Sequence, residues 1–95
     1  MRLDKFLVVA RLVKQRTRAK ELCEGGHVKI GGVTAKAAHD VSVGETLALT
    51  LPRRRLIIKV AGIPAAKLVP KAEAAALYEV VADERTEDYL EPPGQ

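Results

Sequence analysis

The chain has 95 residues, of which 16 are lysine or arginine and 12 are aspartate or glutamate, giving a net charge of +4. Apolar residues make up 47% of the chain, which suffices for one small core but not for a second domain or a deep catalytic cleft. A single cysteine excludes an internal disulfide and a cysteine-built metal cluster, and no apolar run approaches the roughly 18 residues of a membrane span. We therefore expect a small cytoplasmic protein with no signal peptide, metal or cofactor.

Positive charge is concentrated near the N-terminus. Seven of the first twenty residues are lysine or arginine, and Asp4 is the one acid among them. Residues 1–60 hold 13 basic and 5 acidic residues, a net charge of +8, whereas residues 61–95 hold 3 basic and 7 acidic residues, a net charge of −4. This asymmetry predicts that the first part meets a polyanion such as RNA, with the acidic end kept away from it.

Two short helices are predicted first. Apolar residues recur every three or four positions near the N-terminus, which predicts a helix from Arg2 to about Val13. Thr17 belongs to the residues preferred as N-caps, so we expect it to cap a second helix that runs to about Glu24. The Gly25-Gly26 pair ends that helix, because glycine readily takes the left-handed conformation.

Short strands follow, with turns rich in glycine or proline between them. The predicted strands are His27–Ile30, Val33–Ala35, Leu47–Leu51 and Leu56–Val60. Their short connections indicate antiparallel pairing. Pro70 can open a third helix from about Lys71 that reaches toward Tyr78, and Val80-Val81 either adds a strand or completes that helix.

The fold class predicted from these elements is α+β, with two N-terminal helices packed on a small curled antiparallel sheet and a short C-terminal helix. We divide the chain into a domain over residues 1–60, an extension with a short helix over 61–82, and an acidic, flexible tail over 83–95.

The start of the second helix is the best candidate for a phosphate contact. Free backbone N–H groups and the positive end of the helix dipole favour an anion there, and Arg16 adds a planar, bidentate donor. Arg2 and Lys5 can clamp the same phosphate or a base edge, while Asp4 can orient Arg2 or Arg11. The full set of candidate RNA-binding residues is Arg2, Asp4, Lys5, Arg11, Lys14, Arg16, Thr17, Arg18, Lys20, Lys29 and Lys36.

Other residues allow two interpretations. Arg53-Arg54-Arg55 is either a phosphate-binding loop or a charged hairpin tip, and His27 either stacks on a base or is structural. Cys23 shares an apolar helix face and is predicted to be a small core residue. Because the chain has three aromatic residues, we expect it to recognise folded RNA by backbone and shape.

A series of motifs in residues 1–50 resembles the S-four RNA-binding domain, named after ribosomal small-subunit protein four. These motifs are Met1 to Leu7, Ala10-Arg11-Leu12, Lys14, Arg16 to Lys20, Gly25 to Val28, Gly31-Gly32-Val33 with Lys36, Asp40-Val41 and Gly44-Glu45. The resemblance implies the αL-like fold of that domain. Among small stand-alone members, the fifteen-kilodalton heat-shock RNA-binding protein has a long basic C-terminal extension, whereas the bacterial ribosome-associated quality-control P proteins (RqcP, or YabO) are shorter. The acidic end of this chain is similar to the second group.

The resemblance to the second group implies a non-catalytic factor that binds obstructed large ribosomal subunits and peptidyl-tRNA. It would support C-terminal alanine tailing of stalled nascent chains. The implied partners are large-subunit ribosomal RNA, tRNA and an RqcH-type alanine-tailing factor, and the implied state off the ribosome is a monomer. A heat-shock-type recycling factor for free large subunits with nascent chain, and a general tRNA- or rRNA-binding protein, remain as alternatives. An enzyme is not expected, because residues 51–95 carry neither a cofactor loop nor a nucleophile positioned beside a base.

Overall fold

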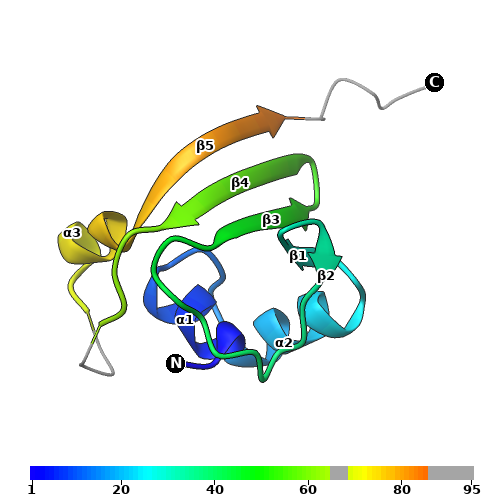
Figure 1. Ribbon diagram of the computed structural model, residues 1–95, viewed down its shortest axis with the longest axis horizontal. Coiled ribbons are helices and arrows are strands. Elements are labelled where there is room, and N and C mark those ends of the chain that lie inside the picture. Colours follow the sequence, from blue (N-terminus) through cyan, green and yellow to red (C-terminus); the bar gives the residue numbers. More distant parts are fainter. Residues whose placement is uncertain (65–68, 86–95) are drawn as a thin grey trace.

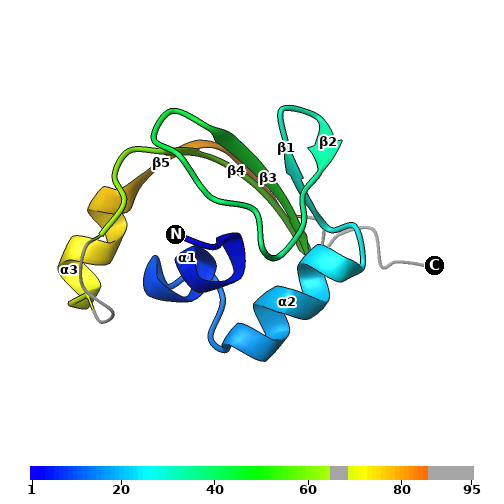
Figure 2. The same ribbon diagram turned by 60° about the horizontal axis from the view of Figure 1, so that its bottom comes forward.

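The computed structural model describes residues 1–64 and 69–85. The elements in chain order are α1 (Leu3–Val9), α2 (Arg16–Glu24), β1 (Val28–Ile30), β2 (Val33–Thr34), β3 (Thr46–Leu51), β4 (Arg54–Val60), α3 (Lys71–Ala74), the 3₁₀ turn η1 (Ala75–Leu77) and β5 (Tyr78–Arg85). The five strands form one antiparallel sheet in the order β2-β1-β3-β4-β5. The sheet arches over α1 and α2, while α3 lies at the end where β4 stops and β5 begins (Figures 1 and 2). The predicted α+β class is confirmed.

The core lies between the two N-terminal helices and the inner face of the sheet. Its largest members are at most 2% exposed: Leu3, Phe6 and Leu7 from α1, Val28 from β1, Leu47 and Leu49 from β3, and Leu56, Ile58 and Val60 from β4. In β3 and β4 these residues alternate with less buried ones, as expected for strands with one face on a core. Full burial of each large aliphatic or aromatic side chain contributes roughly 1.5–3 kcal/mol to folding.

The first helix is shorter than the sequence pattern predicts. It ends at Val9, and Arg11 takes a left-handed φ of 61°. The N–H of Leu12 donates to the carbonyl of Leu7 at 2.9 Å, and the N–H of Arg11 donates to the carbonyl of Val8 at 3.0 Å. This is the Schellman pattern that terminates helices, and it is usually built with glycine. The prediction that the helix runs to Val13 was therefore wrong.

The second helix begins two residues earlier than predicted and ends where predicted. Gln15 occupies the N-cap position, so the prediction of Thr17 as the N-cap was wrong. At the other end Gly26 has a φ of 79°, and the N–H of His27 donates to the carbonyl of Leu22 at 2.9 Å. Glycine at this position closes the helix without the steric cost that a Cβ brings.

Residues 78–85 form the strand β5, which settles the open alternative for Val80 and Val81 in favour of a strand. Tyr78 starts this strand and does not continue the helix. β5 pairs with β4 along its length, with a register irregularity between Ile57 and Ile58. The prediction of a flexible tail from Asp83 was wrong for its first three residues, and residues 86–95 lie outside those described.

Within the described ranges, no helix combines the length and apolarity needed to cross a membrane.

The conformation of Gly26 gives a stability prediction. A Cβ added there meets nothing within 4 Å, so Gly26→Ala tests the left-handed backbone alone. We expect a loss of about 1 kcal/mol in the free energy of unfolding, measured by urea denaturation, because alanine is strained at positive φ. Gly62→Ala is the matched control, since its φ is not positive and its added Cβ meets Leu77 Cδ2 at an ordinary 3.8 Å. Equal stability of the two variants would contradict this account of the turn.

Candidate nucleic-acid interface

A buried carboxylate joins the starts of the two N-terminal helices. Asp4, in the first turn of α1, is 2% exposed. Its Oδ1 accepts hydrogen bonds from the N–H of Lys5 at 2.7 Å and from Nε of Arg2 at 3.3 Å, and its Oδ2 accepts one from Nη2 of Arg2 at 3.3 Å. Nε of Arg16, the first residue of α2, lies 3.4 Å from the same Oδ2. Asp4 therefore holds two guanidinium groups close together.

The ionised form of Asp4 is favoured despite its burial. Burial by itself raises the pKa of a carboxyl group, but hydrogen bonds from Arg2, from the Lys5 N–H and from Arg16 outweigh that effect. The pKa of Asp4 consequently lies below its ordinary value. At neutral pH this carboxylate is charged and neutralises one of its two arginine partners.

The two arginines keep half of their side-chain surface in solvent, 49% for Arg2 and 53% for Arg16. A guanidinium has five N–H donors, and the contacts with Asp4 use two on Arg2 and one on Arg16. Asp4 thus fixes the orientation of both guanidinium groups, and their remaining N–H groups can still donate to a ligand in solvent. Two oriented guanidinium groups suit the planar, bidentate recognition of a phosphate.

The N-terminus of α2 adds a second anion-attracting feature. Within the described residues, no protein acceptor takes the backbone N–H groups of Arg16, Thr17 and Arg18, and no side chain caps this end. The end of a helix that carries free N–H groups also carries the positive pole of its dipole. By contrast, the first N–H groups of α1 are occupied: Leu3 donates to the carbonyl of His39 at 2.8 Å and Asp4 donates to that of Ala37 at 3.2 Å.

A groove of about 450 Å³ runs between α2 and the loop that follows β2. Arg2, Lys20 and Lys36 line it together with Glu24, so its edges are mainly cationic. Cys23 also borders the groove but is 3% exposed and belongs to the core, as predicted. Burial, followed by the nearby Asp4 and Glu24 carboxylates, raises the pKa of the Cys23 thiol to about 11, so it is no nucleophile at neutral pH.

The side chains of four other candidate residues make no contact with Asp4 and do not line the groove. Arg11 donates from Nη2 to the carbonyl of Val69 at 3.3 Å, which ties the end of α1 to the segment before α3. Arg18 pairs with Glu21 at 3.7 Å on the exposed side of α2. Lys14 is exposed in the connection between the helices, and Lys5 is half-buried on α1. Asp4 therefore orients Arg2, as expected, but not Arg11.

Lys29 is on a different side of the molecule. It pairs with Ala48 across β1 and β3, and Ala48 pairs in turn with Ile57, so these residues share the face of the sheet opposite the helices. Lys29 therefore lies apart from Arg2 and Arg16, and its contact with RNA stays a prediction. The alternation of Val28, Lys29 and Ile30 accounts for this position, because Val28 faces the core and its neighbour Lys29 therefore points to the other face of the sheet.

The arginine run after β3 forms a hairpin tip. Pro52 and Arg53 make the turn, with Arg53 at a left-handed φ of 62°, and Arg54 begins β4. Arg54 donates from Nε and Nη2 to the two carboxylate oxygens of Asp83, both at 2.8 Å, and this bond raises its pKa. The structure thus gives Arg54 a partner within the sheet.

Sequence reasoning missed the contact between Arg16 and Asp4. The two residues are twelve positions apart, and their meeting depends on how α1 and α2 pack. The available signal was Asp4, the one acid among the first twenty residues, because an acid in a cationic stretch can pair with more than one basic side chain.

Among the described residues, no group of three or more histidine, cysteine or acidic side chains is arranged to hold a metal ion.

Two helices packed under a curled antiparallel sheet, with an anchored arginine pair beside a cationic groove, define an RNA-binding domain of the S4 type. The S4 domain family model matches residues 1–47. The chain is 42% identical over 84 residues to the RQC P-site tRNA stabilizing factor of Halalkalibacterium halodurans, covering 88% of this chain and 93% of the relative. It is 35% identical over 88 residues to the factor of the same name from Streptococcus pneumoniae, covering 93% and 98%.

A solved structure has the same fold. The heat shock protein 15 of Vibrio cholerae, described as trimeric, superposes with a TM-score of 0.79 at 33% identity, over 86% of this chain and 82% of that one. The chain belongs to the family of the RQC P-site tRNA stabilizing factors, small proteins built on an S4 domain.

The buried carboxylate gives a prediction with a defined pH dependence. We expect Asp4→Asn to lower the free energy of unfolding by about 1–3 kcal/mol at pH 7, because two guanidinium groups lose their charged acceptor. The folded-state pKa lies below the ordinary value of about 3.9. The stabilisation by Asp4 is therefore complete above that pH and is lost as the pH falls through the folded-state pKa. Urea denaturation of both proteins between pH 7 and pH 2.5 measures this.

The control is Glu21→Gln, which removes an exposed ion pair on α2 and should change stability by no more than about 0.5 kcal/mol. A gap between wild type and Asp4→Asn that is small at pH 7, or that grows toward low pH, would refute the proposed role of this carboxylate.

Proposed function

We propose that this protein is a non-catalytic RNA-binding factor of ribosome-associated quality control. The observation that carries the proposal is the Asp4-anchored pair of Arg2 and Arg16 beside the free N-terminus of α2. The names of the relatives support the setting, because both factors are described as stabilizing a tRNA at the P site. The chain would act by binding, since the site offers oriented cations and no activated nucleophile.

The chemistry of the site favours folded RNA. The guanidinium groups of Arg2 and Arg16 donate to one phosphate or to two neighbouring ones, and Lys20 and Lys36 continue the positive surface along the groove. Because the groove and the two helix ends are held by the core, the cations have a fixed spacing. A fixed set of cations selects RNA whose phosphates already have matching positions, which is recognition by shape.

In the finer form of the proposal, the protein binds obstructed large ribosomal subunits in the cytoplasm and touches both ribosomal RNA and peptidyl-tRNA. An RqcH-type factor would then add alanine to the C-terminus of the stalled chain. The protein would hold the tRNA in place between additions. Support comes from the match to RQC factors over almost the whole length of both chains.

The likeness to heat shock protein 15 favours a second candidate, a factor that recycles free large subunits with nascent chain. The match covers 82% of that protein, compared with 93% and 98% of the two RQC factors. A general tRNA- or rRNA-binding role uses the same surface, and the two experiments below separate these options.

The first experiment measures RNA affinity against salt. We expect Arg16→Ala to weaken binding to tRNA or large-subunit RNA by about tenfold, because a charged hydrogen-bond donor is lost. The slope of log affinity against log salt should fall by roughly 0.7–0.9 for each lost phosphate contact. Lys59→Ala removes a charge from the opposite face of the sheet and is the matched control.

Arg16→Lys tests the geometry, since lysine keeps the charge but lacks the planar fork. The proposed RNA interface on this side of the molecule is contradicted if Arg16→Ala binds RNA like wild type. It is also contradicted if Lys59→Ala lowers the RNA affinity as much as Arg16→Ala does.

The second experiment separates the candidate functions in cells. We expect crosslinking followed by RNA sequencing to enrich large-subunit RNA and tRNA with wild type, and Arg16→Ala to lose that enrichment. Deletion of the protein should abolish or reduce alanine tails on stalled chains. Enrichment of messenger RNA alone contradicts the proposal, and unchanged alanine tails with intact large-subunit binding favour the recycling role.

A further inference from the structure

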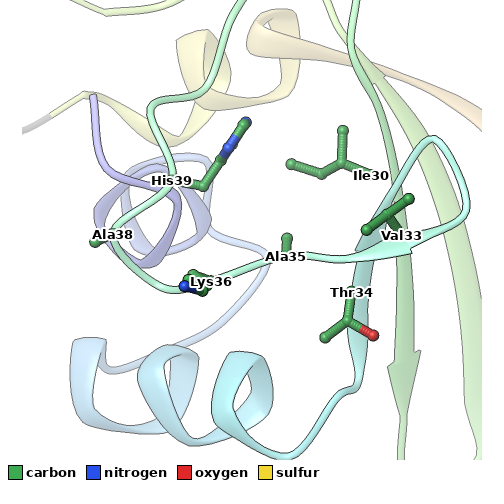
Figure 3. A pocket seen from close by; sticks show the side chains of 7 residues that line it. All are labelled: Ile30, Val33, Thr34, Ala35, Lys36, Ala38 and His39. Carbon is green, nitrogen blue, oxygen red and sulfur yellow. The ribbon is translucent and has the colours of Figure 1, made fainter.

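A second hollow, of about 490 Å³, adjoins the cationic groove. Ile30 and Val33 of the β1–β2 hairpin, together with Ala35, Lys36 and His39, form its main walls (Figure 3). Residues 34, 35, 36 and 38 line both this hollow and the groove, so the two share one wall. Its volume is within the range of small-ligand sites.

The hollow has the shape of a slot with one flat wall. Figure 3 shows the His39 ring edge-on, with one face turned toward Ile30, whose side chain extends toward the ring; Ala35 lies below the space that separates them. Val33, which is 69% exposed, stands at the rim. An aromatic face opposite a branched aliphatic side chain accommodates a flat ring, which stacks on one side and makes apolar contact on the other.

The His39 ring is held in place by a contact between its Nε2 atom and Glu45. Nε2 of His39 lies 3.0 Å from Oε2 of Glu45, and Oε1 of Glu45 accepts the N–H of Ser42 at 2.7 Å. The His39 side chain remains 37% exposed. Because the carboxylate contacts a ring nitrogen and not the ring face, the face stays available for stacking.

We propose that this hollow binds a nucleobase that is turned out of the RNA whose phosphates lie in the adjoining groove. The inference rests on the proposed function and deepens it. Lys36 lines both the hollow and the cationic groove, so it can contact the phosphate of the nucleotide whose base enters the hollow. Continuity with the cationic groove favours a nucleobase over an apolar peptide. Stacking is tolerant of sequence, so such a contact adds affinity to recognition by shape.

The direct test uses the labelled, full-length wild-type protein in solution. It is titrated with AMP or UMP and, in parallel, with ribose 5-phosphate, which carries the same phosphate without a base. We expect all probes to shift the backbone amide signals of Arg16 and Thr17. The two nucleotides alone should also shift the methyl signals of Ile30 and Val33 and the ring signals of His39.

The outcomes separate this inference from the function on which it rests. Shifts at Arg16 and Thr17 without nucleotide-dependent shifts at Ile30, Val33 and His39 overturn the base site alone. Equal shifts in the slot from ribose 5-phosphate do the same, because they show that the base is not recognised. If no probe, and no tRNA, perturbs Arg16 and Thr17, the proposed function itself fails.

Two variants extend the test to RNA. His39→Phe keeps the flat face, whereas His39→Leu keeps bulk but cannot stack, and both lose the contact with Glu45 equally. We expect His39→Leu to weaken tRNA binding about fivefold or more, and His39→Phe to stay within about twofold of wild type. Thermal denaturation checks that both variants fold. Wild-type affinity for both variants, or an equal loss for both, would overturn the proposal.

Discussion

The candidate RNA interface depends on one buried carboxylate. Asp4 is covered by the fold and surrounded by donors from Arg2, Lys5 and Arg16. An unpaired buried charge costs several kcal/mol, so the folded state keeps the carboxylate and both guanidinium groups together. This requirement fixes the starts of α1 and α2 relative to each other and gives the molecule an arginine pair of defined spacing.

The sheet separates two surfaces with different properties. Its inner face packs on α1 and α2, and the anchored arginines, the groove and the slot all lie at the rim of that layer. Its outer face carries charges of both signs, with Arg55 across from Glu84 and Lys59 across from Glu79. Opposite charges on neighbouring strands attract each other and reduce the pull on a polyanion. The guanidinium groups of Arg2 and Arg16 and the lysines of the groove are on the helical side.

Local chemistry made part of the fold predictable. The end of α2 followed from Gly26, because glycine favours the left-handed conformation required there. The end of α1 did not, because Arg11 adopts that conformation in spite of its Cβ. Strand β5 was left open, since Val80 lies close to an alanine-rich stretch with strong helix propensity and its strand is stabilised by pairing with β4. Long-range packing also determines which candidate residues meet. It brings Arg16 to Asp4, whereas Lys29 lies on the opposite face of the sheet.

The capping of α1 has a consequence for how the protein is made. A seven-residue helix does not persist alone in water, and the first N–H groups of this one bond to carbonyls of residues 37 and 39. Its packing partners in β3 and β4 come later still in the chain. The basic stretch that contains α1 therefore cannot complete its hydrogen bonds and packing until residues 37–60 have been synthesised.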